Sequence, residues 1–190
     1  MGTIADEAKK CIEVMRKGGV ILYPTDTVWG IGCDATNAAA VQRVYDIKRR
    51  CDSKALLLLV DSADRLARYV GNVPQVAWDL IELADKPLTI IYDGARNLAP
   101  NLIAEDGSVG IRVTSELFSK ELCYRFQKAV VSTSANISGE PTPANYSEIS
   151  PEIIDAVDYV VNYKQLDKGK AKSSSIIKLA DNGTISIIRP

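Results

Sequence analysis

The segment VILYPTDTVWGIGC, residues 20–33, contains the pattern that decides the fold. Residues 20–23 are apolar and predict a short buried strand, which Pro24 ends. Residues 28–33 are again predicted to be extended, and Gly30 and Gly32 permit another backbone to approach closely. The polar Thr25-Asp26-Thr27 loop therefore joins two buried strands, at the kind of strand end where α/β proteins bind ligands.

Two interpretations of this loop follow from the sequence. In the first, the hydroxyl group of Thr25 or Thr27 hydrogen-bonds a small polar ligand. In the second, the loop is a tight turn in which Asp26 bonds its own backbone, as aspartate commonly does. Taken alone, the loop fits the turn better.

Outside this segment, apolar residues with helical spacing alternate with short apolar runs. Because the last predicted strands have no helices between them, the sheet is expected to be mixed. No linker or internal repeat interrupts the pattern, so residues 1–190 are expected to form a single α/β domain. Helices are predicted over residues 4–17, 37–49, 63–70, 74–84, 116–128 and 151–156, and strands over residues 55–60, 88–92, 108–113, 129–132, 159–161, 175–179 and 184–188.

The composition is that of an ordinary globular protein and excludes several chemistries. Hydrophobic residues make up 46% of the 190 residues, and the net charge of −1 excludes a uniformly basic nucleic-acid-binding surface. The absence of histidine excludes Ser-His-Asp and Cys-His catalysis. The four cysteines form no CxxC motif, and no metal ligands are predicted. Neither a signal peptide nor a membrane-spanning run is recognised, which predicts a cytoplasmic protein that does not enter a membrane.

A basic cluster follows the second predicted helix. Residues 43–54 contain five basic and two acidic residues, and Lys48, Arg50 and Lys54 are among the basic ones. The helix dipole stabilises positive charge at a helix C-terminus, so the cluster could simply be a favourable helix end. It could equally be a phosphate clamp, since arginine binds phosphate with paired hydrogen bonds and lysine binds it as a point charge. The sequence leaves both interpretations open.

A third polar stretch, VVSTSANISG at residues 130–139, runs directly out of a predicted buried strand. Its small side chains and backbone N–H groups could cradle an anion, and the alternative is a turn rich in serine and threonine. It matches neither common glycine-rich phosphate motif. Arg112 lies in an apolar strand and is expected to have a fixed anionic partner, from the protein or from a ligand. Arg189, near the chain end, could equally be solvated.

The order of these motifs resembles that of the YrdC/YciO family. YPTDTVWGIG, Lys-x-Arg with a further lysine four residues on, GIR, STSANISG, a serine cluster at residues 173–175 and a final Arg-Pro follow one another over nearly the whole chain. The resemblance implies a twisted mixed β-sheet flanked by helices, with a large concave basic cavity. It also implies an enzyme, a nucleotidyltransferase that condenses L-threonine, bicarbonate and ATP to threonylcarbamoyl-AMP and pyrophosphate for the threonylcarbamoyladenosine modification of tRNA.

The resemblance further implies a cofactor, partners and site residues. Mg²⁺ would accompany ATP, and separate threonylcarbamoyl-transferase proteins would carry the product to tRNA. No general base is identified, so clamping and electrostatic stabilisation would supply most of the catalysis. Carried over by position, the threonine site would contain Thr27, Arg112, Ser132 and Ser174, and the ATP site would contain Lys48, Arg50, Lys54, Ser108, Ser134, Asn136, Thr142 and Arg189.

Two other functions are consistent with the same sequence. Cys51, Ala55 and Thr114 occupy positions where the family commonly has proline, which leaves open a YciO-like paralogue with another substrate. The retained charged residues favour the synthase. The second alternative is a module of the same fold that binds double-stranded RNA or tRNA without catalysis. Aromatic residues are only 6% of the chain and are not interleaved with the basic residues, which disfavours base stacking.

Overall fold

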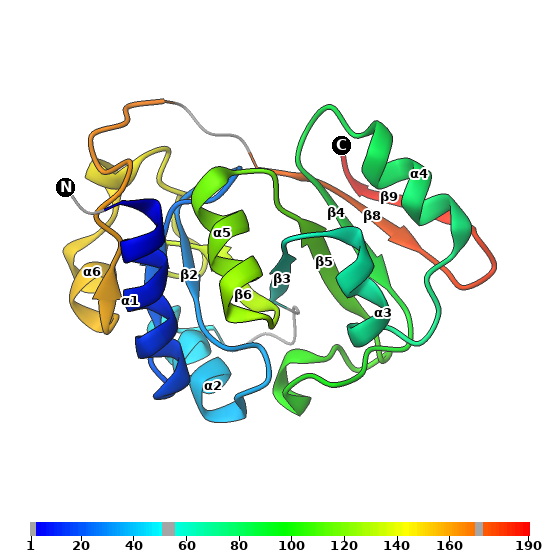
Figure 1. Ribbon diagram of the computed structural model, residues 1–190, viewed down its shortest axis with the longest axis horizontal. Coiled ribbons are helices and arrows are strands. Elements are labelled where there is room, and N and C mark those ends of the chain that lie inside the picture. The colour runs from blue at the N-terminus through cyan, green and yellow to red at the C-terminus, as the bar shows by residue number, and fades with distance from the viewer. Residues whose placement is uncertain (1–2, 51–55, 170–172) are drawn as a thin grey trace.

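The computed structural model describes residues 3–50, 56–169 and 173–190, and its elements follow the predicted alternation (Figure 1). The helices are α1 (Ile4–Arg16), α2 (Ala38–Ile47), α3 (Leu66–Tyr69), α4 (Gln75–Leu83), α5 (Leu117–Phe126) and α6 (Pro151–Ala156). The strands are β1 (Ile21–Tyr23), β2 (Gly30–Gly32), β3 (Leu57–Val60), β4 (Leu88–Tyr92), β5 (Val109–Val113), β6 (Val130–Ser134), β7 (Tyr159–Val160), β8 (Ser175–Leu179) and β9 (Ile185–Arg189).

The predicted elements are present with their ends shifted by a few residues. The helix predicted over residues 63–70 is divided into a 3₁₀ turn, η1 (Ala63–Arg65), and α3. Two further 3₁₀ turns, η2 (Pro100–Leu102) and η3 (Tyr146–Glu148), lie in segments without a predicted helix. The sequence shows no repeating apolar face there, because a single short turn has none.

The strands form one mixed sheet in the order β7-β1-β2-β6-β3-β5-β4-β8-β9. Strands β1 and β2 pair antiparallel across the Thr25-Asp26-Thr27 loop, whereas β3 pairs parallel with β5 and β4 pairs parallel with β8. This confirms the predicted α/β fold with a mixed sheet. The order places β5, which carries Arg112, between β3 and β4 near the middle of the sheet.

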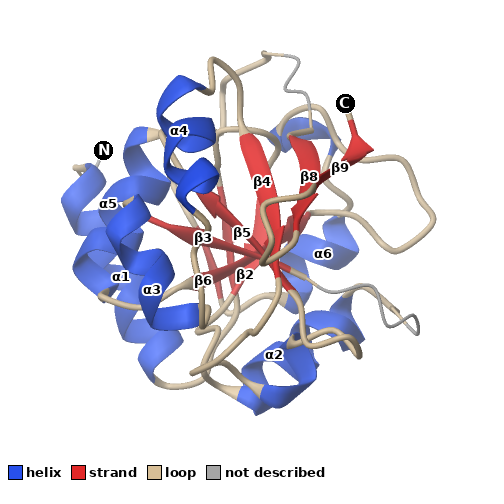
Figure 2. Ribbon diagram, turned by 90° about the vertical axis from the view of Figure 1, so that its right-hand side faces the viewer, coloured by secondary structure: helices blue, strands red, loops and turns tan. Residues whose placement is uncertain are grey.

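Helices cover both sides of the sheet (Figure 2). In that view α1, α3 and α5 lie to one side of the strands and α6 lies to the other. Helix α1 begins at a capping box, in which Thr3 and Asp6 satisfy each other's backbone N–H groups. It is followed by Gly18 with φ +80°, a left-handed conformation that glycine adopts without steric cost. The buried face of α1 includes Ala8, Cys11 and Met15.

The predicted close approach at Gly32 is confirmed. A Cβ atom at Gly32 would overlap Val131 O and would lie 2.6 Å from Cε1 of Tyr23. The buried Tyr23 hydroxyl group donates a hydrogen bond of 3.0 Å to the same Val131 carbonyl. Strands β1, β2 and β6 are therefore packed too tightly for a side chain at position 32, and this fixes the β1–β2 loop against the sheet.

Candidate active site

A cavity of about 690 Å³ brings together most of the side chains predicted for the site. Its walls come from the β1–β2 loop, from β4, β5 and β6, from residues 104–108, and from the chain around β8 and β9. The charged residues of its described lining are three arginines, at positions 50, 112 and 189, and two carboxylates, Glu105 and Asp106. The predicted site residues in the lining are Thr27, Arg50, Ser108, Arg112, Ser132, Ser134, Thr142, Ser174 and Arg189.

The loop between β1 and β2 bends at residues 26–28, and the Thr25 side chain holds it together. The Thr25 hydroxyl group donates to Val28 O at 2.7 Å and accepts from Thr27 N at 3.1 Å. Its oxygen also lies 3.1 Å from the Thr27 hydroxyl oxygen. The predicted bond between Asp26 and its own backbone was wrong. The Asp26 carboxylate pairs instead with Arg112 on β5.

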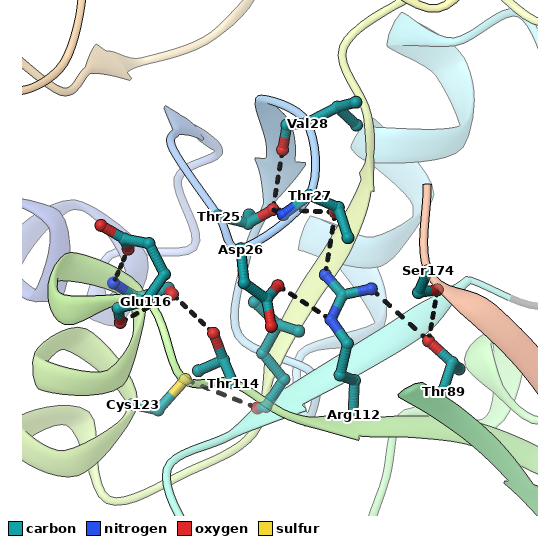
Figure 3. Close-up of polar contacts among 12 residues, drawn as sticks. Thr25, Asp26, Thr27, Val28, Thr89, Arg112, Thr114, Glu116, Cys123 and Ser174 are labelled. Atoms are coloured by element: carbon teal, nitrogen blue, oxygen red, sulfur yellow. Dashed lines mark hydrogen bonds and ion pairs between the residues drawn. The ribbon is translucent and has the colours of Figure 1, made fainter. Parts of the chain in front are cut away.

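Arg112 lies at the centre of the site, and its side chain is only 2% exposed (Figure 3). Its Nε lies 3.0 Å from Asp26 Oδ1, an ion pair that is not aligned as a hydrogen bond. The two Nη atoms donate to the hydroxyl groups of Thr27 at 3.2 Å and Thr89 at 3.4 Å. Burial lowers the pKa of Arg112, and the charge of Asp26 opposes that shift. The fixed anionic partner expected for Arg112 is thus a carboxylate of the protein.

A second group of polar contacts connects β4 to the C-terminal strand. The Thr89 and Ser174 hydroxyl oxygens lie 2.9 Å apart, and both residues are buried. Arg189 donates from Nε to Ser174 O at 2.8 Å and from Nη2 to Ser174 Oγ at 3.4 Å. Arg189 is exposed, and these two hydrogen bonds hold its side chain against Ser174 at the cavity wall. Thr89 was missed, although it is the one polar residue in the apolar strand β4.

The basic cluster is divided by the structure. Arg50 lines the cavity, whereas Lys48 lies behind it and is 3% exposed. Lys48 Nζ donates to the carbonyl oxygens of Ser134 at 2.6 Å and Asn136 at 2.7 Å. Burial, followed by the charge of Arg50, lowers the pKa of Lys48 to about 8. Lys54, the third predicted phosphate ligand, lies outside the described residues.

Asn136 also does not line the cavity. Its Nδ2 donates to Ile137 O at 3.1 Å and Glu140 O at 2.8 Å. Together with the backbone bond from Ser138 N to Lys48 O, 2.9 Å, these contacts fix the shape of the loop after β6. Lys48 and Asn136 therefore support the loop that presents Ser134, instead of facing the cavity themselves.

Acidic side chains at the cavity were not predicted. Ser108 donates through its hydroxyl group to Asp106 Oδ1 at 2.6 Å, and Lys178 Nζ lies 2.7 Å from Asp106 Oδ2. These bonds, the one from Lys178 foremost, lower the pKa of Asp106 to about 2. Asp106 thus stays ionised and orients Ser108, one of the predicted nucleotide-side residues.

At one position where this sequence departs from the family pattern, the structure shows what the different residue does. At position 114, where the family commonly has proline, Thr114 N donates to Val60 O at 3.0 Å, a bond that proline cannot make. The Thr114 hydroxyl group pairs with that of Ser119 at 2.7 Å, in the core and away from the cavity lining. The other two departures, Cys51 and Ala55, lie outside the described residues.

Comparisons with known proteins place the chain in a family. The sequence model of the Sua5/YciO/YrdC family, described as telomere recombination, matches residues 13–190. The chain is 36% identical to a putative threonylcarbamoyl-AMP synthase of Methanocaldococcus jannaschii, covering 96% of this chain and 86% of that protein. It is 34% identical to a threonylcarbamoyl-AMP synthase of Pseudoalteromonas translucida, covering 92% and 93%. The chain therefore belongs to the Sua5/YciO/YrdC family.

Solved structures agree with the fold. Escherichia coli YciO superposes with a TM-score of 0.82 at 25% identity, covering 97% of this chain and 89% of YciO. P. abyssi Sua5 complexed with L-threonine superposes with a TM-score of 0.86 at 21% identity, covering 98% of this chain. The chain spans about half the length of that Sua5 protein, since the match covers 54% of it.

Proposed function

We propose that this protein is an L-threonylcarbamoyladenylate synthase, a nucleotidyltransferase that forms threonylcarbamoyl-AMP and pyrophosphate from L-threonine, bicarbonate and ATP. The observation that carries the proposal is the gathering of a buried, oriented guanidinium group and several hydroxyl groups in one cavity, with further arginines on its wall. The names of relatives that match more than nine tenths of the chain support it. The product would pass to threonylcarbamoyl-transferase proteins that act on tRNA.

The proposed threonine end of the cavity is formed by Thr27, Arg112, Ser132 and Ser174. An amino acid presents a carboxylate, an amine and a side chain, and a guanidinium fork is suited to the carboxylate. The nucleotide would occupy the remainder, with Arg50 and Arg189 near its phosphates and Ser108, Ser134 and Thr142 along it. A volume of about 690 Å³ is within the usual range for small-molecule sites.

The catalytic contribution of these residues is mainly orientation and electrostatic stabilisation. The neutral threonine amine must attack the carbon of bicarbonate, from which water leaves, and the carboxylate of the resulting carbamate must attack the α-phosphorus of ATP as pyrophosphate leaves. Fixed donors aimed at these oxygens stabilise the developing charge without rearranging during the reaction. Mg²⁺ would neutralise the phosphates. The ion would be held mostly by ATP and water, as is common for Mg²⁺ bound with a nucleotide.

The test is pyrophosphate release from the purified chain with ATP, Mg²⁺ and bicarbonate, with and without L-threonine. Release that requires both L-threonine and bicarbonate, with threonylcarbamoyl-AMP detected by mass spectrometry, is the expected result. Release that is independent of threonine, or dependent on a different amine, would favour a YciO-like paralogue with another substrate. The resemblance to YciO, at 25% identity, makes that paralogue the second candidate.

An RNA-binding module is separated from the synthase by a different measurement. Binding of tRNA or double-stranded RNA through phosphate contacts would weaken steeply with salt concentration. Salt-dependent RNA binding without pyrophosphate release would support the RNA-binding module. For membranes there is one structural finding: no helix in the described part of the chain is long and apolar enough to span a bilayer.

A further inference from the structure

The hydrogen bonds around Arg112 have directions that follow from simple counting (Figure 3). An arginine side chain only donates, whereas a hydroxyl group has one hydrogen to donate and an oxygen that accepts. Arg112 donates to a hydroxyl group on each side of it, Thr27 on the β1–β2 loop and Thr89 on β4. The remaining hydrogens of these groups can then be assigned one by one.

On the Thr27 side, every hydrogen is used within the protein. Thr25 gives its single hydroxyl hydrogen to Val28 O, so it has none left for Thr27. The 3.1 Å contact between the two threonine oxygens must therefore have Thr27 as its donor. Thr27 therefore donates its hydroxyl hydrogen to Thr25 and accepts a hydrogen bond from Arg112. One lone pair on the Thr27 oxygen remains available to accept a hydrogen bond from a ligand in the cavity.

On the opposite side, one hydrogen is left over. Arg112 donates to Thr89, and Arg189 donates to Ser174, so neither arginine can accept a hydrogen from this pair. The two hydroxyl groups have two hydrogens between them, and their 2.9 Å contact uses one. No acceptor in the described part of the chain is bonded to the other hydrogen. Both residues line the cavity and are 2% exposed, so the spare hydrogen is available to a group bound in the cavity.

We infer that Thr89 and Ser174 act as one unit that donates a single hydrogen bond to an oxygen of the amino-acid substrate, opposite the acceptor that Thr27 presents. This rests on the proposed function. The substrate carboxylate, which only accepts, then lies at the Thr89–Ser174 unit and Arg112, and the amine or hydroxyl group, which can donate, lies at Thr27. Thr89 is thereby assigned a place in substrate recognition.

A donor shared by Thr89 and Ser174 predicts different mutational effects from a substrate contact made by Ser174 alone. If Thr89 is changed to valine, Ser174 keeps its hydroxyl hydrogen and no longer needs it for Thr89. If Ser174 is changed to alanine, Thr89 likewise has a free hydrogen at the cavity. The donor is lost only when both hydroxyl groups are removed. The double variant should therefore lose more than the two single variants combined.

The experiment is a double-mutant cycle with Thr89→Val and Ser174→Ala, read as the KM for L-threonine and the KM for ATP. We expect the double variant to exceed the product of the two single effects on the threonine KM by about tenfold, with a much smaller change in the ATP KM. Thr89→Ser, which keeps the hydroxyl group, should resemble the wild type. A full loss in Ser174→Ala with no further loss in the double variant would overturn the inference, and so would additive effects.

A matched control is provided by Thr114→Val and Ser119→Ala. These residues form a second buried threonine–serine pair, 2.7 Å apart and outside the cavity lining. Their cycle should change the melting temperature and leave the threonine KM unchanged. Should the Thr89→Val, Ser174→Ala protein not fold, Thr89→Cys in the Ser174→Ala background replaces the hydroxyl group by a poor donor and completes the cycle.

The result also separates this inference from the proposed function. If the wild type binds L-threonine in calorimetry but releases no pyrophosphate, the proposed reaction is wrong and the same cycle is read from the threonine dissociation constants. If the wild type does not bind L-threonine at all, the inference is overturned together with the threonine site.

Discussion

Arg112 and Lys48 are both buried cations, but the protein compensates their charges differently. Arg112 is paired with the carboxylate of Asp26 and donates to two hydroxyl groups at the cavity. Lys48 donates to two backbone carbonyl groups behind the cavity, and no carboxylate within the described ranges forms an ion pair with it. The first arrangement fixes a charged group where a ligand can use it, whereas the second uses a charged group to hold a loop.

The pKa values follow from this difference. Burial lowers the pKa of both groups, but only Arg112 has a carboxylate that opposes the shift. Burial lowers the pKa of Lys48 to about 8, and no nearby carboxylate among the described residues offsets the cost of burying its charge. Substitutions at Asp26, Arg50, Lys48 and Arg112 test how the protein compensates its buried and cavity-facing cations.

Replacing Asp26 by asparagine should destabilise the fold strongly. Arg112 would remain buried without its carboxylate, and removing one partner of a buried pair typically costs about 3–5 kcal/mol. Urea denaturation measures the change in the free energy of unfolding. Glu121→Gln, which breaks the exposed pair with Arg125, is the control and should cost less than about 1 kcal/mol. Equal costs for the two variants would mean that the Asp26–Arg112 pair contributes no more than a surface pair.

Arg50→Ala tests one of the three arginines that line the cavity. Removing one charge-assisted contact costs about 1.5–3 kcal/mol, so ATP affinity should fall by about tenfold to a hundredfold with an unchanged melting temperature. Arg49→Ala, at the neighbouring exposed residue that pairs with Glu152, should leave ATP binding intact. A sharp fall in melting temperature with normal ATP binding would make Arg50 part of a structural helix end.

Lys48→Met should change how stability depends on pH. In the wild type both folded and unfolded Lys48 are charged below pH 8, so the folded state bears the full cost of burial. Between the folded pKa of about 8 and the unfolded value of 10.5, only the unfolded state holds the proton, so stability rises with pH. Relative to Lys48→Met, the wild type should gain about 2 kcal/mol between pH 7 and pH 9.5. Parallel curves would show that the charge of Lys48 is not buried.

Arg112→Lys gives the smallest expected effect. An ammonium group cannot reproduce the guanidinium fork that pairs with Asp26 and reaches Thr27 and Thr89 together. The KM for L-threonine should rise at least about tenfold, roughly 1.4 kcal/mol, with the ATP KM nearly unchanged. An equal loss of ATP binding would show that Arg112 contacts the phosphates or only supports the fold.

The sequence was sufficient to predict the helices and strands and most of the residues that line the candidate site. Apolar periodicity identified α1 and α2 because each buries one face. Short apolar runs identified β1 and β3, whose residues are mostly buried, whereas the five residues of the apolar strand β9 are exposed. Of the residues singled out by motif, those on or beside strands lie together in the cavity. Lys48 and Asn136 were predicted at the ATP site but are absent from the cavity lining, since a motif gives the residue type and not the direction of its side chain.

The order of helices and strands, the polar loop between β1 and β2 and the family membership can all be derived from the sequence. Which polar groups meet depends on the tertiary structure. Arg112 and Thr27 are 85 positions apart in the chain, as are Thr89 and Ser174, and Lys48 is 86 positions from Ser134. Periodicity reports only on neighbours within a few turns, whereas the partner of a buried charge depends on which strands the sheet brings side by side.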